Sequence, residues 1–438
     1  MEDPATARRP GPAVDAGDTP PRVRSRATVI ALCWLAIVVD GYDLIVYGSV
    51  LPTLISSEWR LTPAEGGRIG AAALVGMLIG ALVAGYLTDR IGRRRLMVLC
   101  IAWFSAAMAV SALAPTPELF GVTRFVAGIG LGGVVPTAIA LTVEFAPPGR
   151  RNAANALMFS GYSVGGVLAA LGGIWMIEAF GWRSMFWTGA LVGLVLVAVV
   201  WALMPESVVY LVGRGRHEDA RAVARRYGMD VPEPAATTGA RAGGLRELLR
   251  PEHRAGTFLF WGGTAAGLLL VYGLNTWLAQ IMRQAGYPLG GALGFLLALN
   301  LGAILGAPLF GALADRIGPR PVVTGMFLAA AGSILLLMVE LPTVLLLSLV
   351  AIAGACTIGT TIIVNSFTAT YYPEHLRAVG LSWALGVGRI GAISGPLYGG
   401  LIMSTGWGFQ ANFLAFAVPA VLGAVLMALV PSRAAARS

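Results

Sequence analysis

Two aspartates stand inside a stretch that is otherwise apolar enough to cross a membrane. Asp40 and Asp43 lie near the middle of the run from about 27 to 54, separated by Gly41 and Tyr42. A carboxylate at the bilayer centre costs roughly 2.5–3.5 kcal/mol on insertion scales. Residues three apart share one helix face, so we expect both side chains to face the protein interior or a wet cavity. Burial and mutual repulsion favour a bound proton, which is the behaviour that a proton carrier needs.

Arg389 carries the opposite charge at a similar depth. It lies roughly 17 Å into an apolar window that begins near 378, at about 1.5 Å per residue. Its planar guanidinium matches a carboxylate through two parallel hydrogen bonds. A permanent salt bridge within its own half is one alternative, but no other charged residue of the last six apolar windows lies as deep. We therefore favour a carboxylate of a bound ligand.

Arg124 is the candidate charge partner of the acidic pair. It lies in the outer third of the fourth apolar window and could reach one of the aspartates along its apolar stem. We favour Asp43 as the proton carrier, with Asp40 either a second carrier or the anchor of Arg124.

The composition requires a polytopic membrane protein. Of 438 residues, 57% are hydrophobic and only 12% are charged, against about 25% charged in a soluble protein. The net charge of +9 comes from arginines placed between apolar windows rather than in one patch, which indicates topology and argues against a nucleic-acid partner. The expected surroundings are a lipid bilayer.

Twelve windows are long and apolar enough to span a membrane. They form two sets of six, at about 27–54, 68–88, 96–114, 119–142, 153–177 and 184–204, and at about 256–281, 289–314, 321–340, 343–368, 378–402 and 409–430. The predicted organisation is a disordered tail (1–26), an N-terminal six-helix bundle (27–204), a linker with surface helices (205–255), a C-terminal six-helix bundle (256–430) and a short tail (431–438). Arginines cluster on the side of both tails and of the linker, so the positive-inside rule places these three segments in the cytoplasm.

An internal repeat supports two related halves. The segment from Gly85 to Arg94 matches the segment from Gly311 to Arg320 at one offset, which superimposes Asp89 on Asp315. Inverted or parallel repeats of this kind are common in transporters. With a shift of one residue, Val46-Tyr47-Gly48 aligns with Val271-Tyr272-Gly273, yet no acidic residue matches Asp40 or Asp43. The acidic pair is therefore expected to serve chemistry rather than the scaffold.

The chain resembles the major facilitator superfamily over essentially residues 27–430. The loop motif GxLxDRxGRR, its weaker second copy and the six-plus-six arrangement carry this resemblance. Asp40-Gly41-Tyr42-Asp43, the glycine-rich run after Arg124, Pro205-Glu206-Ser207 and Gly388-Arg389 resemble the aromatic acid:proton symporter family. The implied fold is all-α, with twelve transmembrane helices in two halves related by a pseudo-two-fold axis.

The resemblance also implies a latch at the cytoplasmic face, made in one access state and broken in the other. Its loop aspartate would lie near a helix N-terminus of the other half, where the helix dipole favours an anion. The candidate latch residues are Gly85, Asp89, Arg90, Gly92, Arg93, Arg94, Glu144, Asp315, Arg316 and Arg377.

The function that we expect is proton-coupled uptake of a small aromatic carboxylate, such as benzoate or hydroxybenzoate, across a bacterial cytoplasmic membrane by a monomer. Arg389 would hold the carboxylate, and the acidic pair would carry the proton. The remaining candidates near the substrate are Tyr42, Tyr47, Trp277, Gln280 and Asn300. Transport of another organic anion or sugar-like metabolite, a drug-type proton antiporter and a transporter-like ligand sensor remain alternatives.

The energy source is expected to be the proton gradient, without a cofactor. A P-loop needs a lysine after its glycines, and the chain has no lysine. The three histidines are scattered in loops without the spacing of metal ligands. Nothing in the sequence resembles a nucleophile with its base, so we do not expect an enzyme.

Overall fold

The computed structural model describes residues 25–231 and 244–431. The predicted disorder of 1–24, the middle of the linker and the tail from 432 onward lie outside these described residues. Within them the chain forms helices and no strand. Twelve of the helices are long and apolar enough to cross a membrane, which confirms the predicted all-α fold with twelve spans.

The spanning helices occur in two sets of six. The first set is α1 (Arg26–Thr53), α2 (Pro63–Ile91), α3 (Arg93–Ala112), α4 (Pro117–Phe145), α5 (Arg151–Phe180) and α6 (Arg183–Leu203). The second set is α10 (Pro251–Gln284), α11 (Leu289–Ile317), α12 (Pro319–Leu336), α13 (Thr343–Tyr371), α14 (Glu374–Ser404) and α15 (Phe409–Ala428). Between them lie α7 (Val208–Gly213), α8 (His217–Tyr227) and α9 (Leu245–Leu248), and the π-helical turn η1 (Leu54–Glu58) continues α1.

Helix starts follow local signals that the hydrophobic windows alone do not contain. The Thr62 side chain caps α2 by accepting from the Glu65 main-chain N–H, and the Thr62 main-chain N–H donates to the Glu65 carboxylate, with Pro63 at the first helical position. α10 also has a proline, Pro251, at its first position but no side-chain cap, and it begins before the predicted boundary at 256. Arg26, which we placed in the tail, is the first residue of α1.

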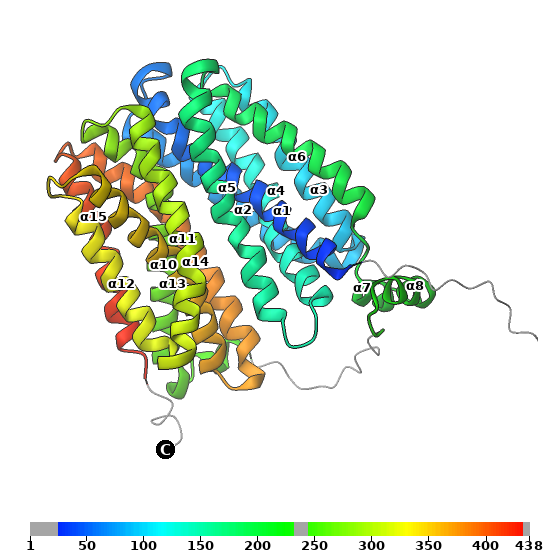
Figure 1. Ribbon diagram of the computed structural model, residues 1–438. Coiled ribbons are helices and arrows are strands. Elements are labelled where there is room, and N and C mark those ends of the chain that lie inside the picture. The colour runs from blue at the N-terminus through cyan, green and yellow to red at the C-terminus, as the bar shows by residue number, and fades with distance from the viewer. Residues whose placement is uncertain (1–24, 232–243, 432–438) are drawn as a thin grey trace, which may run out of the picture.

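The same helix pairs pack in both halves. α1 lies against α5 and α2 against α4, as α10 lies against α14 and α11 against α13. Figure 1 shows the two bundles side by side. The repeated loop motif has one structural reason for its glycine: Gly92 and Gly318 each join two helices alone, at φ 94° and φ 90°. A side chain is strained at such angles.

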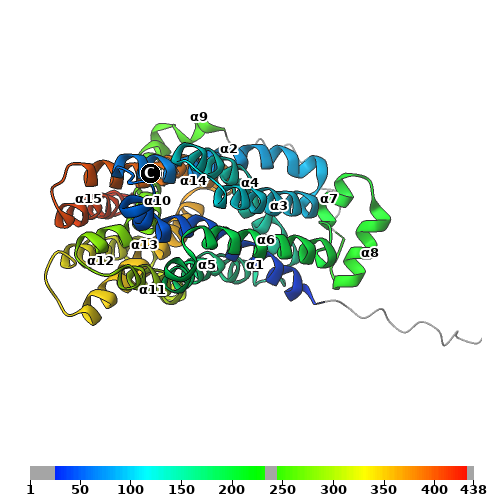
Figure 2. The ribbon, with the colours of Figure 1, turned by 90° about the horizontal axis from the view of Figure 1, so that it is seen from above.

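Successive spanning helices run in opposite directions, so their ends and the segments that connect them lie at two faces of the molecule (Figure 1). We call the side where α7, α8 and α9 lie the linker face and the other side the opposite face. α8 packs beside the first half, where Arg26 donates to the Tyr227 carbonyl at 2.9 Å. α9 packs on the second half, where Thr257 donates to the Leu248 carbonyl at 3.0 Å. Figure 2 shows α8 and α9 over different parts of the bundle.

The two halves meet at the opposite face. There α2 packs against α14, α5 against α11, and α1 against α10. A Cβ on Gly67 would come within 2.7 Å of the Pro396 carbonyl, and one on Gly48 within 1.9 Å of the Asn275 carbonyl. Near the linker face, a Cβ on Gly85 would have no neighbour within 4 Å. The halves are thus packed at the opposite face and separated toward the linker face (Figure 1).

Candidate functional site

A buried ion pair joins α1 to α4 inside the first half. Arg124 Nη1 donates to Asp43 Oδ1 at 2.7 Å, and Nη2 donates to the Asp43 main-chain carbonyl at 2.9 Å. Both side chains are buried, at 2% and 0% exposure. The guanidinium carbon also lies 5.7 Å from the centre of the Phe186 ring. One charge-assisted hydrogen bond therefore engages the Asp43 carboxylate, and a second ties the same guanidinium to the Asp43 main chain.

This contact settles which aspartate Arg124 meets. Of the two aspartates, Asp43 and not Asp40 contacts Arg124 in this structure. Asp43 is therefore the residue that anchors Arg124, because its position faces α4. The choice of Asp43 as the proton carrier loses its basis, since a carboxylate fixed in an ion pair gives up its charge only at the cost of leaving Arg124 unpaired.

Asp40 is the carboxylate without a partner. It is only 1% exposed, and neither of its oxygens accepts a hydrogen bond from any described residue. Asp43 and, from the other half, Arg389 lie within electrostatic range of it. A buried carboxylate without a hydrogen-bonded partner is costly in its charged form, so the charges around Asp40 decide whether it holds a proton.

Arg389 reaches the interface between the halves from α14. Its Nη1 contacts the sulfur of Met77 on α2 at 3.3 Å, and a thioether is a weak acceptor. Within the described residues no carboxylate oxygen lies within 4.0 Å of its guanidinium. The alternative of a permanent salt bridge in its own half is therefore not realised, and the fork of donors remains available.

Two tyrosines that the sequence analysis did not select lie near Asp40 and Arg389, and we call these four residues the centre. Tyr162 of α5 and Tyr272 of α10 meet edge to face across the halves, with ring centroids 6.5 Å apart. Asp40 and Arg389 lie within electrostatic range of both. The internal repeat offered one signal for Tyr162. The offset that superimposes Asp89 on Asp315 also aligns Arg389 with Ser163, the residue next to Tyr162.

The residues predicted beside the substrate are mostly occupied elsewhere. The Tyr42 hydroxyl donates to the Met185 carbonyl at 2.9 Å, within the first half. Tyr47 donates to the Gly66 carbonyl at 2.6 Å, and Trp277 donates to the Pro396 carbonyl at 2.8 Å. Both of these contacts lie in the packing near the opposite face. These residues were chosen by type, whereas the helix face that each occupies decides what it contacts.

The amide residues show a similar outcome. Asn300 donates to the Asn275 side-chain oxygen at 3.1 Å, and its own side-chain oxygen is the nearest atom to a Cβ built on Gly166 of the first half. It therefore lies at the interface, in the closed part. Gln280 is buried near the end of α10, toward the opposite face and away from Arg389.

A small enclosed space extends the centre toward the opposite face. It has a volume of about 10 Å³, close to what one water molecule needs. Tyr47, Arg124, Tyr272 and Thr276 are among the residues that line it, so it touches both halves.

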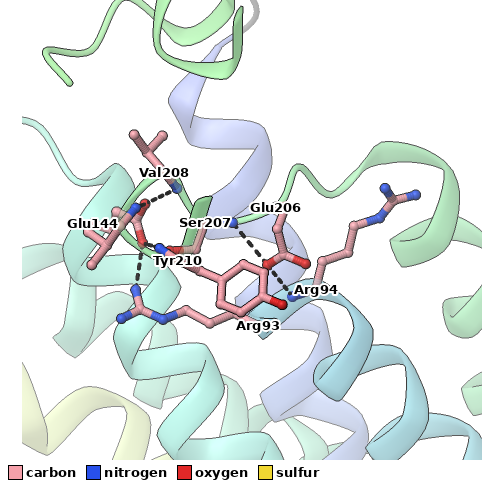
Figure 3. A network of polar contacts seen from close by, with 8 residues as sticks. Arg93, Arg94, Glu144, Glu206, Ser207, Val208 and Tyr210 are labelled. Carbon is pink, nitrogen blue, oxygen red and sulfur yellow. Dashed lines mark hydrogen bonds and ion pairs between the residues drawn. The ribbon is translucent and has the colours of Figure 1, made fainter. Parts of the chain in front are cut away.

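At the linker face, Glu144 collects several donors at the end of α4 (Figure 3). It accepts from Arg93 Nη1 at 2.5 Å and from the Ser207 hydroxyl at 2.7 Å. The main-chain N–H groups of Val208 and Val209 donate to its other oxygen at 2.6 and 3.2 Å. The carboxylate thus satisfies the free N–H groups at the start of α7 and joins that helix to α3.

Glu206 makes the second part of this network (Figure 3). Its Oε1 accepts from the main-chain N–H groups of Arg94 and Ser207, each at 3.0 Å. The Tyr210 hydroxyl donates to the Arg90 carbonyl at 3.1 Å. The Pro205-Glu206-Ser207 motif therefore docks the start of the linker on the loop between α2 and α3.

The predicted latch residues divide into two groups. Arg93 and Glu144 are in contact, and Arg214 donates to the main-chain carbonyls of Asp89 and Arg90 at 3.0 and 2.6 Å. These contacts join the first half to the linker, and within the described residues Asp89, Arg90, Arg93 and Glu144 form no hydrogen bond or ion pair with the second half. A latch between the halves is not made in this conformation and stays a prediction.

The other latch candidates lie apart from these contacts. In the first half, Arg94 belongs to the network around Glu206, Gly92 connects α2 to α3, and a Cβ on Gly85 would have no close neighbour. In the second half, Asp315 and Arg316 are exposed, and the Arg377 guanidinium lies 3.9 Å from the Glu374 carboxylate.

Within the described residues no group of histidine, cysteine, aspartate and glutamate side chains is placed to hold a metal ion.

The family model for the Major Facilitator Superfamily matches residues 33–304 and 292–438. The chain belongs to this superfamily, and it is a multi-pass membrane transporter rather than an enzyme. Membership was predicted from the loop motif and its repeat, and is confirmed.

Its relatives are named for aromatic acids. A benzoate transport protein of Acinetobacter baylyi is 38% identical, over 92% of this chain and 89% of its own length. A gentisate transporter of Corynebacterium glutamicum is 37% identical, over 92% of this chain and 87% of its own. The similarity to aromatic acid transporters that we predicted is confirmed.

A solved structure of a bacterial homologue of the human lysosomal transporter Spinster, inward-facing and unoccupied, shares the fold with a TM-score of 0.74. The match covers 94% of this chain and 98% of that one, at 20% identity.

Proposed function

We propose that the chain takes up a small aromatic carboxylate together with a proton, binding the carboxylate at Arg389 and the proton at Asp40. The observation that carries this proposal is the arrangement of Arg389 and Asp40 on opposite halves, within electrostatic range, each without a hydrogen-bonded charge partner. The relatives named for benzoate and gentisate support the substrate class.

The charge balance at this centre couples the two ligands. In the empty site the ionised Asp40 offsets the charge of Arg389. A substrate carboxylate on Arg389 takes over this role, and Asp40 then becomes an uncompensated anion in a buried place unless it binds a proton. The substrate and one proton therefore bind together, and the site keeps zero net charge both empty and loaded. This predicts one proton for each monocarboxylate.

The direction of uptake follows from the arginines. They gather on the linker face, so we place that face and both tails in the cytoplasm of a bacterial cell. The conformation described above is then open toward the cytoplasm and closed toward the outside. All the groups of the site come from one chain, so we expect a monomer to suffice.

Transport would proceed by rocking one half against the other. Opening the opposite face breaks the packing around Trp277 and Gly67, and closing the linker face brings the loop that contains Asp89 toward the second half, where we place the latch. The proton gradient supplies the energy, because the loaded site forms only with a proton bound.

A binding measurement tests the role of Arg389. Arg389→Ala should abolish the binding of labelled benzoate to the detergent-solubilised protein, since the carboxylate would enter a poorly solvated site without compensation. Arg389→Lys keeps the charge but not the planar fork, and should bind more weakly than the native protein. Arg283→Ala, an exposed arginine of the same half, is the control. Unchanged affinity in Arg389→Ala would refute the site.

A flux measurement tests the coupling. Proteoliposomes should accumulate labelled benzoate when a pH gradient is imposed, and an imposed potassium diffusion potential without a pH gradient should not drive accumulation. Since benzoic acid crosses lipid unaided, protein-free liposomes and Arg389→Ala proteoliposomes give the background. Asp40→Asn should still exchange labelled for unlabelled benzoate but lose the response to pH. Accumulation driven by the potential alone, or an intact pH response in Asp40→Asn, would contradict the proposal.

A further inference from the structure

The tyrosines of the spanning helices differ in how their hydroxyl groups are used. Tyr42, Tyr47 and Tyr398 each donate to a main-chain carbonyl, of Met185, Gly66 and Ala415 respectively, at 2.9, 2.6 and 2.9 Å. The Tyr162 hydroxyl oxygen is shielded from solvent but donates to no main-chain carbonyl, and its hydroxyl neighbour is Tyr272 of the other half. A buried phenol that the scaffold does not hold by a main-chain hydrogen bond can instead bond to a ligand.

The place of Tyr162 is fixed by the packing of α5 on α1. A Cβ on Gly41, next to Asp40, would come within 2.3 Å of the Tyr162 carbonyl oxygen, and one on Gly165 within 2.2 Å of the Val38 carbonyl. The two backbones therefore touch at the level of the acidic residue. This contact sets the depth of the Tyr162 side chain beside the proposed proton carrier.

Tyr272 brings a second hydroxyl to the same point from the other half. Its ring meets that of Tyr162 at an interplanar angle of 77°, and its hydroxyl lies near the Tyr162 hydroxyl. Tyr272 also lines the small enclosed space beside Arg124 and Thr276. Two phenols, one from each half, thus meet near Asp40 and the arginine that would hold a carboxylate.

We propose that Tyr162 and Tyr272 form a binding site for a hydroxyl group on the aromatic ring of the substrate, so that the transporter selects hydroxylated benzoates over benzoate. This inference rests on the proposed function. A ligand whose carboxylate binds Arg389 directs its ring away from the guanidinium, and a phenol hydroxyl can both donate to and accept from a ring hydroxyl. A ligand without that group leaves the tyrosine hydroxyl unpaired, which a buried site penalises.

The pair would also link recognition to movement. Because Tyr162 and Tyr272 belong to different halves, a ring hydroxyl that bonds to both joins the halves at the centre. The preference for hydroxylated acids should therefore appear in binding and in the rate of transport alike.

The test compares affinities for benzoate and for 2-, 3- and 4-hydroxybenzoate in the purified full-length protein. At least one hydroxybenzoate should bind the native protein about tenfold or more tightly than benzoate, as one well-placed hydrogen bond allows. Tyr162→Phe and Tyr272→Phe should each reduce this ratio to about one while the affinity for benzoate changes by less than about twofold. Tyr398→Phe, which removes a hydroxyl bound within the second half, should leave the ratio unchanged.

The other outcomes overturn the inference in ways that can be told apart. Equal losses for all four acids in Tyr162→Phe, in a variant that melts at the native temperature, would mean that the hydroxyl serves the carboxylate common to all four and not the ring hydroxyl. If the native protein binds all four acids with equal affinity, no group of the site recognises the ring hydroxyl. A native protein that binds none of them would refute the proposed function itself.

Discussion

The structure assigns different roles to two neighbouring aspartates, and their amide variants should separate these roles. Asp43→Asn removes the anion that compensates Arg124, while Asp40→Asn removes a charge that has no hydrogen-bonded partner. We expect the first variant to be strongly destabilised and the second to be as stable as the native protein or more stable. The sequence alone ranks the two residues the other way.

The magnitude follows from the burial of the pair. Arg124 and Asp43 are exposed by only 2% and 0%, so solvent screens little of their interaction. Removing one partner of a buried ion pair costs about 3–5 kcal/mol, because the other charge stays buried without compensation. Asparagine keeps an oxygen that can accept the Arg124 hydrogen bond, so Asp43→Asn should fall near about 3 kcal/mol, and Asp43→Ala nearer 5 kcal/mol.

Thermal unfolding of the detergent-solubilised variants measures this difference. A double variant, Asp43→Asn with Arg124→Gln, provides the control, since it leaves no unpaired charge and should recover part of the stability lost in Asp43→Asn. The reasoning fails if Asp40→Asn melts as low as Asp43→Asn. It also fails if the stability lost in the double variant, relative to the native protein, equals the sum of the losses in Asp43→Asn and Arg124→Gln, which would show no coupling between the two side chains.

Three further predictions concern the scaffold. Gly92→Ala should lower the melting temperature more than Gly318→Ala. Both positions have positive φ, but only a Cβ on Gly92 would come within 2.4 Å of a side-chain oxygen, that of Glu206. Equal effects would show that the backbone strain at positive φ alone matters. Glu144→Gln should weaken the docking of α7 and speed trypsin cleavage within α8, and an unchanged cleavage rate would remove this role. Gly67→Val should prevent the close approach to Pro396 and raise the labelling of a cysteine placed at Thr276 from the opposite face; native labelling would mean that the packing there can adjust.

The fold could be predicted from the sequence because its main signals are local. Apolar windows, the arginine asymmetry and the repeated loop motif each depend on residue type and order, and the twelve helices agree with them. The acidic pair and Arg389 could likewise be selected, because a charge in a spanning helix is unexpected wherever it points. Thus the charged members of the site were found without coordinates.

The remaining members depend on which way a side chain points. Tyr42, Tyr47 and Trp277 are aromatic residues of spanning helices, as Tyr162 and Tyr272 are, and composition does not separate the two sets. The first set lies in contacts with Met185, Gly66 and Pro396, and only the second lies beside Arg389. The pairing of Arg124 with Asp43 rather than Asp40 has the same origin, since the position of each carboxylate along α1, about one helical turn apart, decides which one reaches Arg124.

Alternating access requires a distinction between contacts within a half and contacts across the halves. Asp43 and Arg124 both belong to the first half, so their distance stays the same when the halves rock, and the pair can serve only as a fixed part of the scaffold. The same holds for the network around Glu144, which moves with the first half and the linker.

Asp40 and Arg389 lie on different halves, and their separation changes with the access state. A proton that binds Asp40 therefore alters the free energy of one access state relative to the other, whereas a proton on Asp43 would mainly destabilise the first half in both. For this reason the unpaired carboxylate, and not its paired neighbour, is the one suited to couple the proton to transport.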